Sequence, residues 1–225
     1  MTDARFLRSY TSPRPDIEAL VPDGVHTVLD VGCSTGVLGA AIKDRTGAKV
    51  IGIELDAEMA ATAASRLDQV HVGDAAALLM GDTFRDQRFD VIVFADVLEH
   101  LVDPWEVLRR AGELLTDGGC VVTSLPNVRH VSTLFHLAVL GHWPYRDRGI
   151  HDRTHLRFFT LRNVRELFQQ AGFRIERMNT NYRLRERPKR INRIAKWFAF
   201  PGIRGFLAYQ YLVRAVCMGS QDRRS

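Results

Sequence analysis

LDVGCSTGVLG, residues 29–39, joins an apolar run, HTVLDVG (26–32), to an alanine-rich run, GVLGAAIKDR (36–45). The pattern predicts a strand, a tight turn and a helix in direct succession. Gly32 and Gly36 permit the backbone conformations that a tight turn requires, and they let a ligand approach the main chain closely. A unit of this kind is typical of the cofactor-binding start of an α/β sheet.

The same alternation continues along the chain. Further strands are predicted at 49–54, 69–74, 88–96, 118–127, 173–182 and 208–218, and further helices at 57–67, 103–115 and 160–172. Five apolar strands that alternate with helices predict a parallel sheet covered on both faces. We therefore expect one domain over residues 1–225, with an N-terminal extension (1–25), a lid (128–158) and a basic amphipathic insertion (183–206). Within the lid, LFHLAVLG (134–141) predicts a short buried helix or an apolar cover.

Composition excludes several classes of protein. The chain is 46% hydrophobic and has three widely spaced cysteines, which argues against a disulfide framework and against a thiolate zinc site. No apolar run is long enough to span a bilayer, and the N-terminus lacks a secretory leader, so we expect a cytoplasmic protein.

The positive charge of the chain is local. Residues 183–204 contain eight basic side chains and one acid, a net charge of +7, so that the rest of the chain, whose total is +5, lies near −2. The segment is interpreted first as a solvated helix face. Trp197, Phe198 and Phe200 also favour peripheral contact with the anionic inner face of a membrane, and an anionic acceptor is a third interpretation. Nucleic-acid binding is not expected, because the motifs of RNA-binding modules are missing.

Two kinds of cofactor compete for the first turn. A dinucleotide requires the pattern G-x-G-x-x-G, and here Ser34 and Val37 stand at the second and third glycine positions. Asp30 favours a cofactor that carries a positive group, and Glu54 at the end of the second strand could accept hydrogen bonds from ribose hydroxyls. Asp74 could meet an adenine amino group with help from the Ala75 backbone. S-adenosylmethionine, with an ammonium and a sulfonium, fits these residues better than a dinucleotide.

The ordered motifs LDVGCSTG, GIELD, VGDA, FDVIVFADVLEHL and LLTDGG resemble those of class I S-adenosylmethionine-dependent methyltransferases. The resemblance covers about residues 25–182 and the final strand. It implies an α/β fold with a Rossmann-like, doubly wound, seven-stranded sheet whose last strand is antiparallel, with helices on both faces. Ser34 stands where many members carry glycine. The cofactor contacts implied are Asp30, Gly32, Cys33, Ser34, Gly36, Glu54, Leu55, Asp74, Ala75 and Ala95.

The stretch FADVLEHL (94–101) carries three polar side chains after the fourth strand. In a helical turn Asp96, Glu99 and His100 would share one face. They follow the carboxyl end of a strand, where α/β folds place their chemistry. The alternative is structural, with Asp96 as a helix cap and His100 as a half-buried histidine.

A second stretch, GIHDRTHLRFFT (149–160), concentrates histidine and arginine. It resembles a segment of methyltransferases encoded among bacterial polysaccharide-synthesis genes. The Glu-His pair with a later histidine also resembles ubiquinone-pathway O-methyltransferases and small-RNA 2′-O-methyltransferases, which use a divalent cation. The resemblance implies Mg²⁺ or another divalent cation held by Glu99, His100 and His155, with Asp96 as a further ligand. Our own hypothesis for the catalytic residues is that His155 or His151 is the base that deprotonates the acceptor, and that His100 with Glu99 holds the cation.

These features predict an O-methyltransferase that acts on a hydroxyl of a sugar in an oligosaccharide, polysaccharide or glycolipid. A quinone precursor or another small natural product is the alternative acceptor, and a non-catalytic cofactor-binding subunit is the alternative of another class. The candidate acceptor contacts are Asn127, Trp143, Tyr145, Arg148 and Arg157, since aromatic faces stack on sugar rings and arginine donates to hydroxyls. A dimer is compatible with the sequence.

Overall fold

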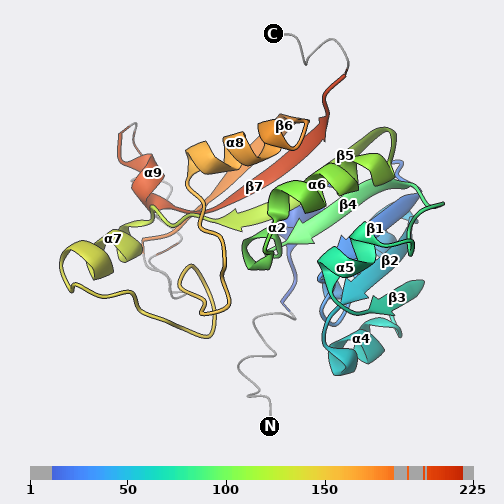
Figure 1. Cartoon of the computed structure of the whole chain (residues 1–225), viewed down its shortest axis with the longest axis horizontal. Coiled ribbons are helices and arrows are strands. Elements are labelled where there is room, and N and C mark those ends of the chain that lie inside the picture. The colour runs from blue at the N-terminus through green and yellow to red at the C-terminus, as the bar shows by residue number, and fades with distance from the viewer. Residues whose placement is uncertain (1–11, 185–191, 193–199, 201, 220–225) are drawn as a thin grey trace.

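The fold is built on one seven-stranded sheet (Figure 1). The computed structural model describes residues 12–184, 192, 200 and 202–219. The strands are β1 (Thr27–Val31), β2 (Lys49–Glu54), β3 (Gln69–Val72), β4 (Phe89–Ala95), β5 (Leu115–Pro126), β6 (Phe173–Tyr182) and β7 (Ala208–Cys217). Their order in the sheet is β3-β2-β1-β4-β5-β7-β6. Strands β1 to β5 pair in parallel, whereas β7 pairs antiparallel with both β5 and β6. The predicted fold class is confirmed.

Helices cover both faces of this sheet. They are α2 (Pro15–Glu18), α3 (Val37–Thr46), α4 (Ala57–Ala63), α5 (Ala75–Met80), α6 (Pro104–Leu114), α7 (Val131–Ala138), α8 (Leu161–Gln170) and α9 (Arg204–Leu207), with a 3-10 turn, η1 (Leu98–His100). Alternate residues of β1 separate the two cores: Leu29 and Val31 belong to a buried cluster with α5, α6 and α8, and Val28 belongs to one with α2, α3 and α4. In Figure 1 the helices α5, α6 and α8 lie on the face of the sheet that is toward the viewer.

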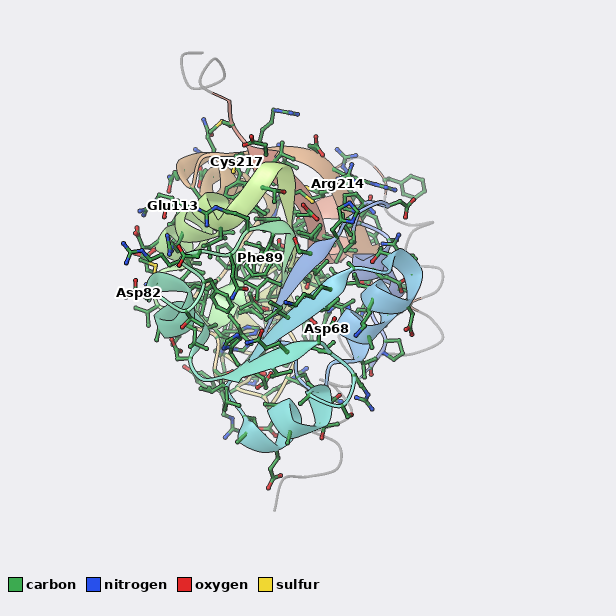
Figure 2. The ribbon with its side chains drawn as sticks, turned by 90° about the vertical axis from the view of Figure 1, so that its right-hand side faces the viewer. Asp68, Asp82, Phe89, Glu113, Arg214 and Cys217 are labelled. Carbon is green, nitrogen blue, oxygen red and sulfur yellow. The ribbon has the colours of Figure 1, made fainter. Side chains whose placement is uncertain are left out.

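Figure 2 views the molecule from the side on which β2 and β3 lie. Asp68 lies beside these strands, while Arg214 and Cys217 of β7 lie toward the top of the view, three or more strands away in the order of the sheet. Phe89, at the start of the central strand β4, is 1% exposed. Phe89 belongs to the buried cluster that α5, α6 and α8 cover.

Most predicted helix boundaries are set by capping side chains. Asp103 accepts a hydrogen bond from Glu106 N at 2.9 Å and caps α6, and Thr160 forms a capping box with Asn163 at the start of α8. Several elements differ from the prediction. Helix α4 ends at Ala63, strand β5 begins at Leu115, directly after α6, and the sequence analysis did not predict α5.

Two peripheral segments also differ from expectation. The described part of the N-terminal extension belongs to the core, because Ile17 and Leu20 are fully buried. Residues 134–141 were expected to form a short buried helix or an apolar cover; a helix, α7, does form there, but its burial is wrong, because Phe135 is 51% exposed and Leu137 is 47% exposed. In Figure 1, α7 and the loop after it lie beyond the arrowheads of β4 and β5.

Most of the basic insertion, including Trp197 and Phe198, lies outside the described residues. Phe200 is described and is 61% exposed. Among the residues that the structure describes, no helix is both long enough and apolar enough to cross a membrane.

Candidate active site

The turn after β1 is built around Gly32. The amides of Gly32 and Cys33 donate to Ile53 O of β2 at 2.8 and 2.9 Å, so the loop is tied to the neighbouring strand. Gly32 has φ 72°, and a Cβ atom there would lie 2.6 Å from Cγ2 of Val97. Glycine is required at this position both for its backbone conformation and for the close approach of the loop that follows β4.

Glu54 anchors the same turn from the end of β2. Its Oε2 accepts from Ser34 N at 2.7 Å and its Oε1 accepts from Asp56 N at 2.9 Å. Ser34 adopts φ 52°, a left-handed conformation that explains why many methyltransferases carry glycine there. Gly36, with φ 76°, packs against α4, where an added Cβ would lie 3.1 Å from Ala63 Cα. These contacts preform a cradle at the carboxyl ends of β1 and β2.

Asp30 was expected to face a positive group, and the structure places it differently. Its side chain is 1% exposed, accepts a hydrogen bond from the Gly39 backbone, and has one oxygen, Oδ2, without a hydrogen-bond partner among the described residues. Burial, and then the nearby charge of Glu54, raises the pKa of Asp30 to about 7. Asp30 is therefore a buried residue of β1 whose side chain contacts the start of α3.

The remaining cofactor candidates lie at the rim. Asp74 caps α5 by accepting from Ala77 N at 2.8 Å, so Ala75 opens a helix, and Leu55 is 70% exposed at the end of β2. Ala95 is the last residue of β4 and is half-buried. Beside this rim lies a cavity of about 260 Å³, lined by Asp74, Ala76, Met80, His100, Leu101, Val102, Asp103, Glu106 and Val107.

The turn after β4 departs from the helical geometry expected of it. Asp96 has φ 59° and precedes the 3-10 turn η1, so it does not share a helical face with Glu99 and His100. It is not a cap either, because η1 begins after Val97 and has no side-chain cap. The carboxylate of Asp96 instead accepts hydrogen bonds from Arg14, Ser124 and Gln210.

The structure does bring together Glu99, His100 and His155. One ligand atom from each lies within 4.8 Å of the others. The two imidazole rings meet edge to face with centroids 4.7 Å apart, and His155 Nε2 lies 3.9 Å from Glu99 Oε1. Glu99 is 1% exposed, and its other oxygen, Oε2, has no hydrogen-bond partner among the described residues.

Both histidine rings are oriented by the backbone of the 150–157 segment. His155 Nδ1 lies 3.2 Å from Ile150 O, and His100 Nδ1 lies 3.3 Å from Thr154 O. A carbonyl can only accept, so each Nδ1 carries the proton and each Nε2 keeps a free lone pair. The segment is fastened over the turn because the amides of Leu156 and Arg157 both donate to Glu99 O, at 2.9 and 3.0 Å.

The electrostatics of this cluster follow from its burial. Burial, and then the charge of Asp96, raises the pKa of Glu99 well above its ordinary value. Burial, and then the neighbouring His100, lowers the pKa of His155 to about 4. An uncharged imidazole beside an unpaired carboxylate oxygen is a donor set that a divalent cation would complete, so the residues present fit the cation that the resemblance implies.

Two predicted residues have other surroundings. His151 is fully buried, with Nε2 3.0 Å from Thr133 Oγ1 and its ring against Trp143, and it does not belong to the Glu99 cluster. Asn127 was expected to face the acceptor, but its buried amide donates to Gly205 O and Ala208 O at 2.9 and 2.7 Å. Its surroundings are those of a structural residue.

The other acceptor candidates lie on the loop that follows α7. Tyr145 is 73% exposed and Arg148 is exposed, whereas Trp143 packs edge to face on Phe158. Arg157 donates to Val102 O at 3.0 Å through Nε, which fastens the loop to the β4 turn. Tyr145 and Arg148 are thus open to a ligand.

Sequence reasoning missed three residues of this region. Arg14 and Gln210 bind Asp96 from the N-terminal segment and from β7, and Thr154 bonds His100 through its hydroxyl at 3.0 Å. Arg14 lies 82 positions from Asp96 along the chain, and no local pattern signals a contact over that separation.

A glycine turn after β1, an acid at the end of β2 and an antiparallel β7 in a seven-stranded sheet define the fold class of S-adenosylmethionine-dependent methyltransferases. The chain belongs to the family described as "Methyltransferase domain", whose profile matches residues 5–177. The family and fold predicted from the sequence are thereby confirmed.

Named relatives are similar over part of their length. The ubiquinone biosynthesis O-methyltransferase of Psychrobacter arcticus is 34% identical over 155 residues, which cover 65% of this chain and 58% of that protein. The protein of the same name from Cereibacter sphaeroides is 31% identical over 170 residues, which cover 70% of this chain and 64% of the relative. The chain thus spans less than two thirds of the length of these two relatives.

Among solved structures, the magnesium protoporphyrin IX methyltransferase of Synechocystis PCC 6803 with bound SAH (S-adenosylhomocysteine) has a similar fold. The TM-score is 0.60 at 15% identity, and the match covers 94% of this chain and 83% of that one. At this level of identity the likeness is one of fold.

Proposed function

We propose that the chain is an S-adenosylmethionine-dependent O-methyltransferase whose acceptor carries two adjacent hydroxyl groups, and that a divalent cation binds at Glu99, His100 and His155. One observation carries the proposal: the buried Glu99 carboxylate, one oxygen of which has no hydrogen-bond partner among the described residues, lies beside a pair of imidazoles whose Nδ1 atoms are bound to backbone carbonyls. Hydrogen bonds of this kind orient metal-binding histidines in proteins.

The cradle after β1 and β2 is the proposed methyl-donor site. When bound there, S-adenosylmethionine supplies the methyl group. Each Glu54 oxygen accepts one backbone hydrogen bond and keeps a second lone pair, so the side chain can also accept from the two ribose hydroxyls. Gly32 leaves the main chain open to close approach.

A bound cation would lower the pKa of an acceptor hydroxyl, which is a poor nucleophile at neutral pH. His155 has a single free nitrogen, Nε2, because Nδ1 donates to Ile150 O. That nitrogen can serve as a ligand or as a base, but not as both. We assign it to the cation together with His100, since the cation itself makes the hydroxyl easier to deprotonate. Asp96 is engaged by Arg14 and is left out of the ligand set.

The acceptor is proposed from two sources that point to different compounds. Both relatives described above are named for ubiquinone biosynthesis, which favours a phenolic quinone precursor. The resemblance of residues 149–160 to polysaccharide-associated methyltransferases favours a sugar, and the exposed Tyr145 and Arg148 suit either ring. We place the quinone precursor first and the sugar second. Both offer the adjacent hydroxyls that the cation requires. Contact of the 183–204 segment with an anionic membrane stays a prediction.

The test is methyl transfer from labelled S-adenosylmethionine to a 1,2-dihydroxybenzoate, to its monomethyl ether and to a fractionated glycan extract. We expect label in the dihydroxy compound or the glycan, no label in the monomethyl ether, and loss of transfer in Glu99→Gln. Methyl transfer that continues after exhaustive chelation would show that the reaction does not need a divalent cation. Cofactor binding without transfer to any acceptor would instead support the non-catalytic subunit.

A further inference from the structure

Asp96 is held in a backbone conformation that residues with a side chain rarely adopt. Its φ is 59°, at the point where β4 ends and the turn that carries Glu99 and His100 begins. Strained residues of this kind persist only where their surroundings restrain them, and they are concentrated at functional sites. The restraint on Asp96 therefore bears on the geometry of the candidate cation site.

The restraint comes from three other elements of the fold. Asp96 N donates to Ser124 Oγ of β5 at 3.0 Å, and the same hydroxyl donates to Asp96 Oδ1 at 2.9 Å. Gln210 Nε2 of β7 also donates to Oδ1. Arg14 Nη1, from the N-terminal segment, donates to the second oxygen, Oδ2, at 2.5 Å. Both carboxylate oxygens are thus engaged, one of them by Arg14.

Arg14 is itself fixed on its other side. Its Nε and Nη2 donate to the two oxygens of Asp16 at 3.0 and 3.3 Å, in a two-pronged contact that sets the plane of the guanidinium. Asn181 Nδ2 of β6 donates to the same Asp16 at 2.8 Å. The Arg14 side chain is 22% exposed, so the pair is shielded from much of the solvent. Arg14 thereby links the β6 edge to the end of β4.

The restraint reaches the cation cluster through a short, stiff turn. His100 N donates to Val97 O at 2.9 Å, and Val97 packs against Gly32, so the turn is held by a backbone hydrogen bond and by a contact with the loop after β1. Asp96 stands three residues before Glu99 in the chain, so its backbone leads directly into the turn that carries two of the three ligands. A rotation of the backbone at Asp96 would displace Glu99 and His100 relative to His155, which is carried by a different segment.

We propose that Arg14 is a positioning residue for the Glu99–His100–His155 cluster: by binding the Asp96 carboxylate it fixes the turn that carries Glu99 and His100, two of the three ligands. The inference rests on the proposed cation site. It assigns Arg14 no contact with cation, cofactor or acceptor, so its effect must pass through Asp96.

The experiment measures Mn²⁺ affinity of the full chain by calorimetry at saturating S-adenosylhomocysteine, and S-adenosylhomocysteine affinity separately. We expect Arg14→Ala to weaken Mn²⁺ binding about 10- to 100-fold, as loss of an outer-shell partner does, and to leave S-adenosylhomocysteine binding within about twofold. Arg14→Lys should recover part of the loss, since lysine keeps the charge without the planar fork.

Arg45→Ala is the matched control. Arg45 pairs with Glu18 and donates to Val21 O at 2.8 Å, so it ties down the same N-terminal segment without touching Asp96. We expect it to leave Mn²⁺ affinity unchanged. An equal loss in Arg45→Ala would overturn the proposal, because general docking of the segment would then explain both results.

A double-mutant cycle tests the route of the effect. In an Asp96→Ala background, Arg14→Ala should weaken Mn²⁺ binding no further. A full additional loss there, or Mn²⁺ affinity within about twofold of wild type in a folded Arg14→Ala protein, overturns the inference and leaves the proposed function intact. If Arg14→Ala does not fold, unchanged Mn²⁺ affinity in Arg14→Lys and Arg14→Gln overturns it too. A wild-type chain that binds no Mn²⁺ overturns both proposals.

Discussion

Replacing Asp30 by Asn should make the protein's stability less sensitive to pH between 5 and 8. Asp30, in the strand that leads to the proposed cofactor cradle, is 1% exposed, and burial, with a smaller contribution from Glu54, raises its pKa to about 7. An acid with a raised pKa in the folded state binds its proton more tightly there than in the unfolded chain. The folded state is therefore favoured at low pH, and this advantage is lost as pH rises from the unfolded pKa of 3.8 to the folded value of about 7.

The size of the effect follows from linkage. Each pKa unit corresponds to about 1.4 kcal/mol, and integration between pH 5 and pH 8 gives a loss of up to about 2.5 kcal/mol from Asp30 alone. Carboxylates with a lowered pKa act in the opposite direction and at lower pH: burial raises the pKa of Asp90, but hydrogen bonds from the His26 and Thr27 amides and from the Thr116 and Thr27 hydroxyls together lower it below its ordinary value. Only the difference between the wild type and the variant isolates Asp30.

Asparagine suits the comparison because it has the same shape. Its Oδ1 can still accept from the Gly39 backbone, and its Nδ2 replaces the unpartnered Oδ2. Any cost of that new buried donor is independent of pH and cancels between the two conditions.

The assay is urea unfolding of wild type and Asp30→Asn at pH 5 and pH 8. Between pH 5 and pH 8 the free energy of unfolding of the variant, relative to that of the wild type, should increase by up to about 2.5 kcal/mol. Asp86→Asn, on the exposed surface, controls for the loss of one negative charge. A difference between wild type and Asp30→Asn that is the same at both pH values would refute this account of the buried carboxylate.

Two further predictions concern the cradle. Gly32→Ala should lower S-adenosylhomocysteine affinity at least tenfold and destabilise the fold more than Gly47→Ala, because both glycines have φ 72° but only Gly32 faces a close neighbour, Val97. Thermal melts and calorimetry measure both effects, and equal destabilisation by the two substitutions would count against the clash. Asp74→Asn should keep the cap on Ala77 N and hence the melting temperature, while lowering S-adenosylhomocysteine affinity if the carboxylate meets the adenine amino group. Unchanged S-adenosylhomocysteine affinity in Asp74→Asn would show that Asp74 caps α5 and does not contact the adenine amino group.

The sequence predicted those features that depend on local pattern. The turn at Gly32, the acid at Glu54 and the alternation of strands and helices follow from residue type and spacing, and each is present. The parallel pairing of β1 to β5 follows from the alternation of apolar strands with helices. The meeting of Glu99 and His155 was implied by family resemblance, because no local rule relates residues on separate loops.

Features set by tertiary contact could not be predicted in this way. The left-handed conformation of Asp96 depends on Arg14 and Gln210, which are remote in sequence. The local sequence does not show which of His151 and His155 belongs to the cluster with Glu99. In the fold, His151 is buried against Thr133, away from that cluster. The exposure of α7 likewise reflects what packs on it, which an apolar pattern does not reveal.

The central claim is that Glu99, His100 and His155 bind a divalent cation beside the methyl-donor site. Anomalous diffraction from crystals grown with Mn²⁺ and S-adenosylhomocysteine tests it most directly. The account predicts one peak within bonding distance of a Glu99 oxygen and of one ring nitrogen of each histidine. No peak among these three side chains at saturating Mn²⁺, with S-adenosylhomocysteine bound in the cradle, would contradict it.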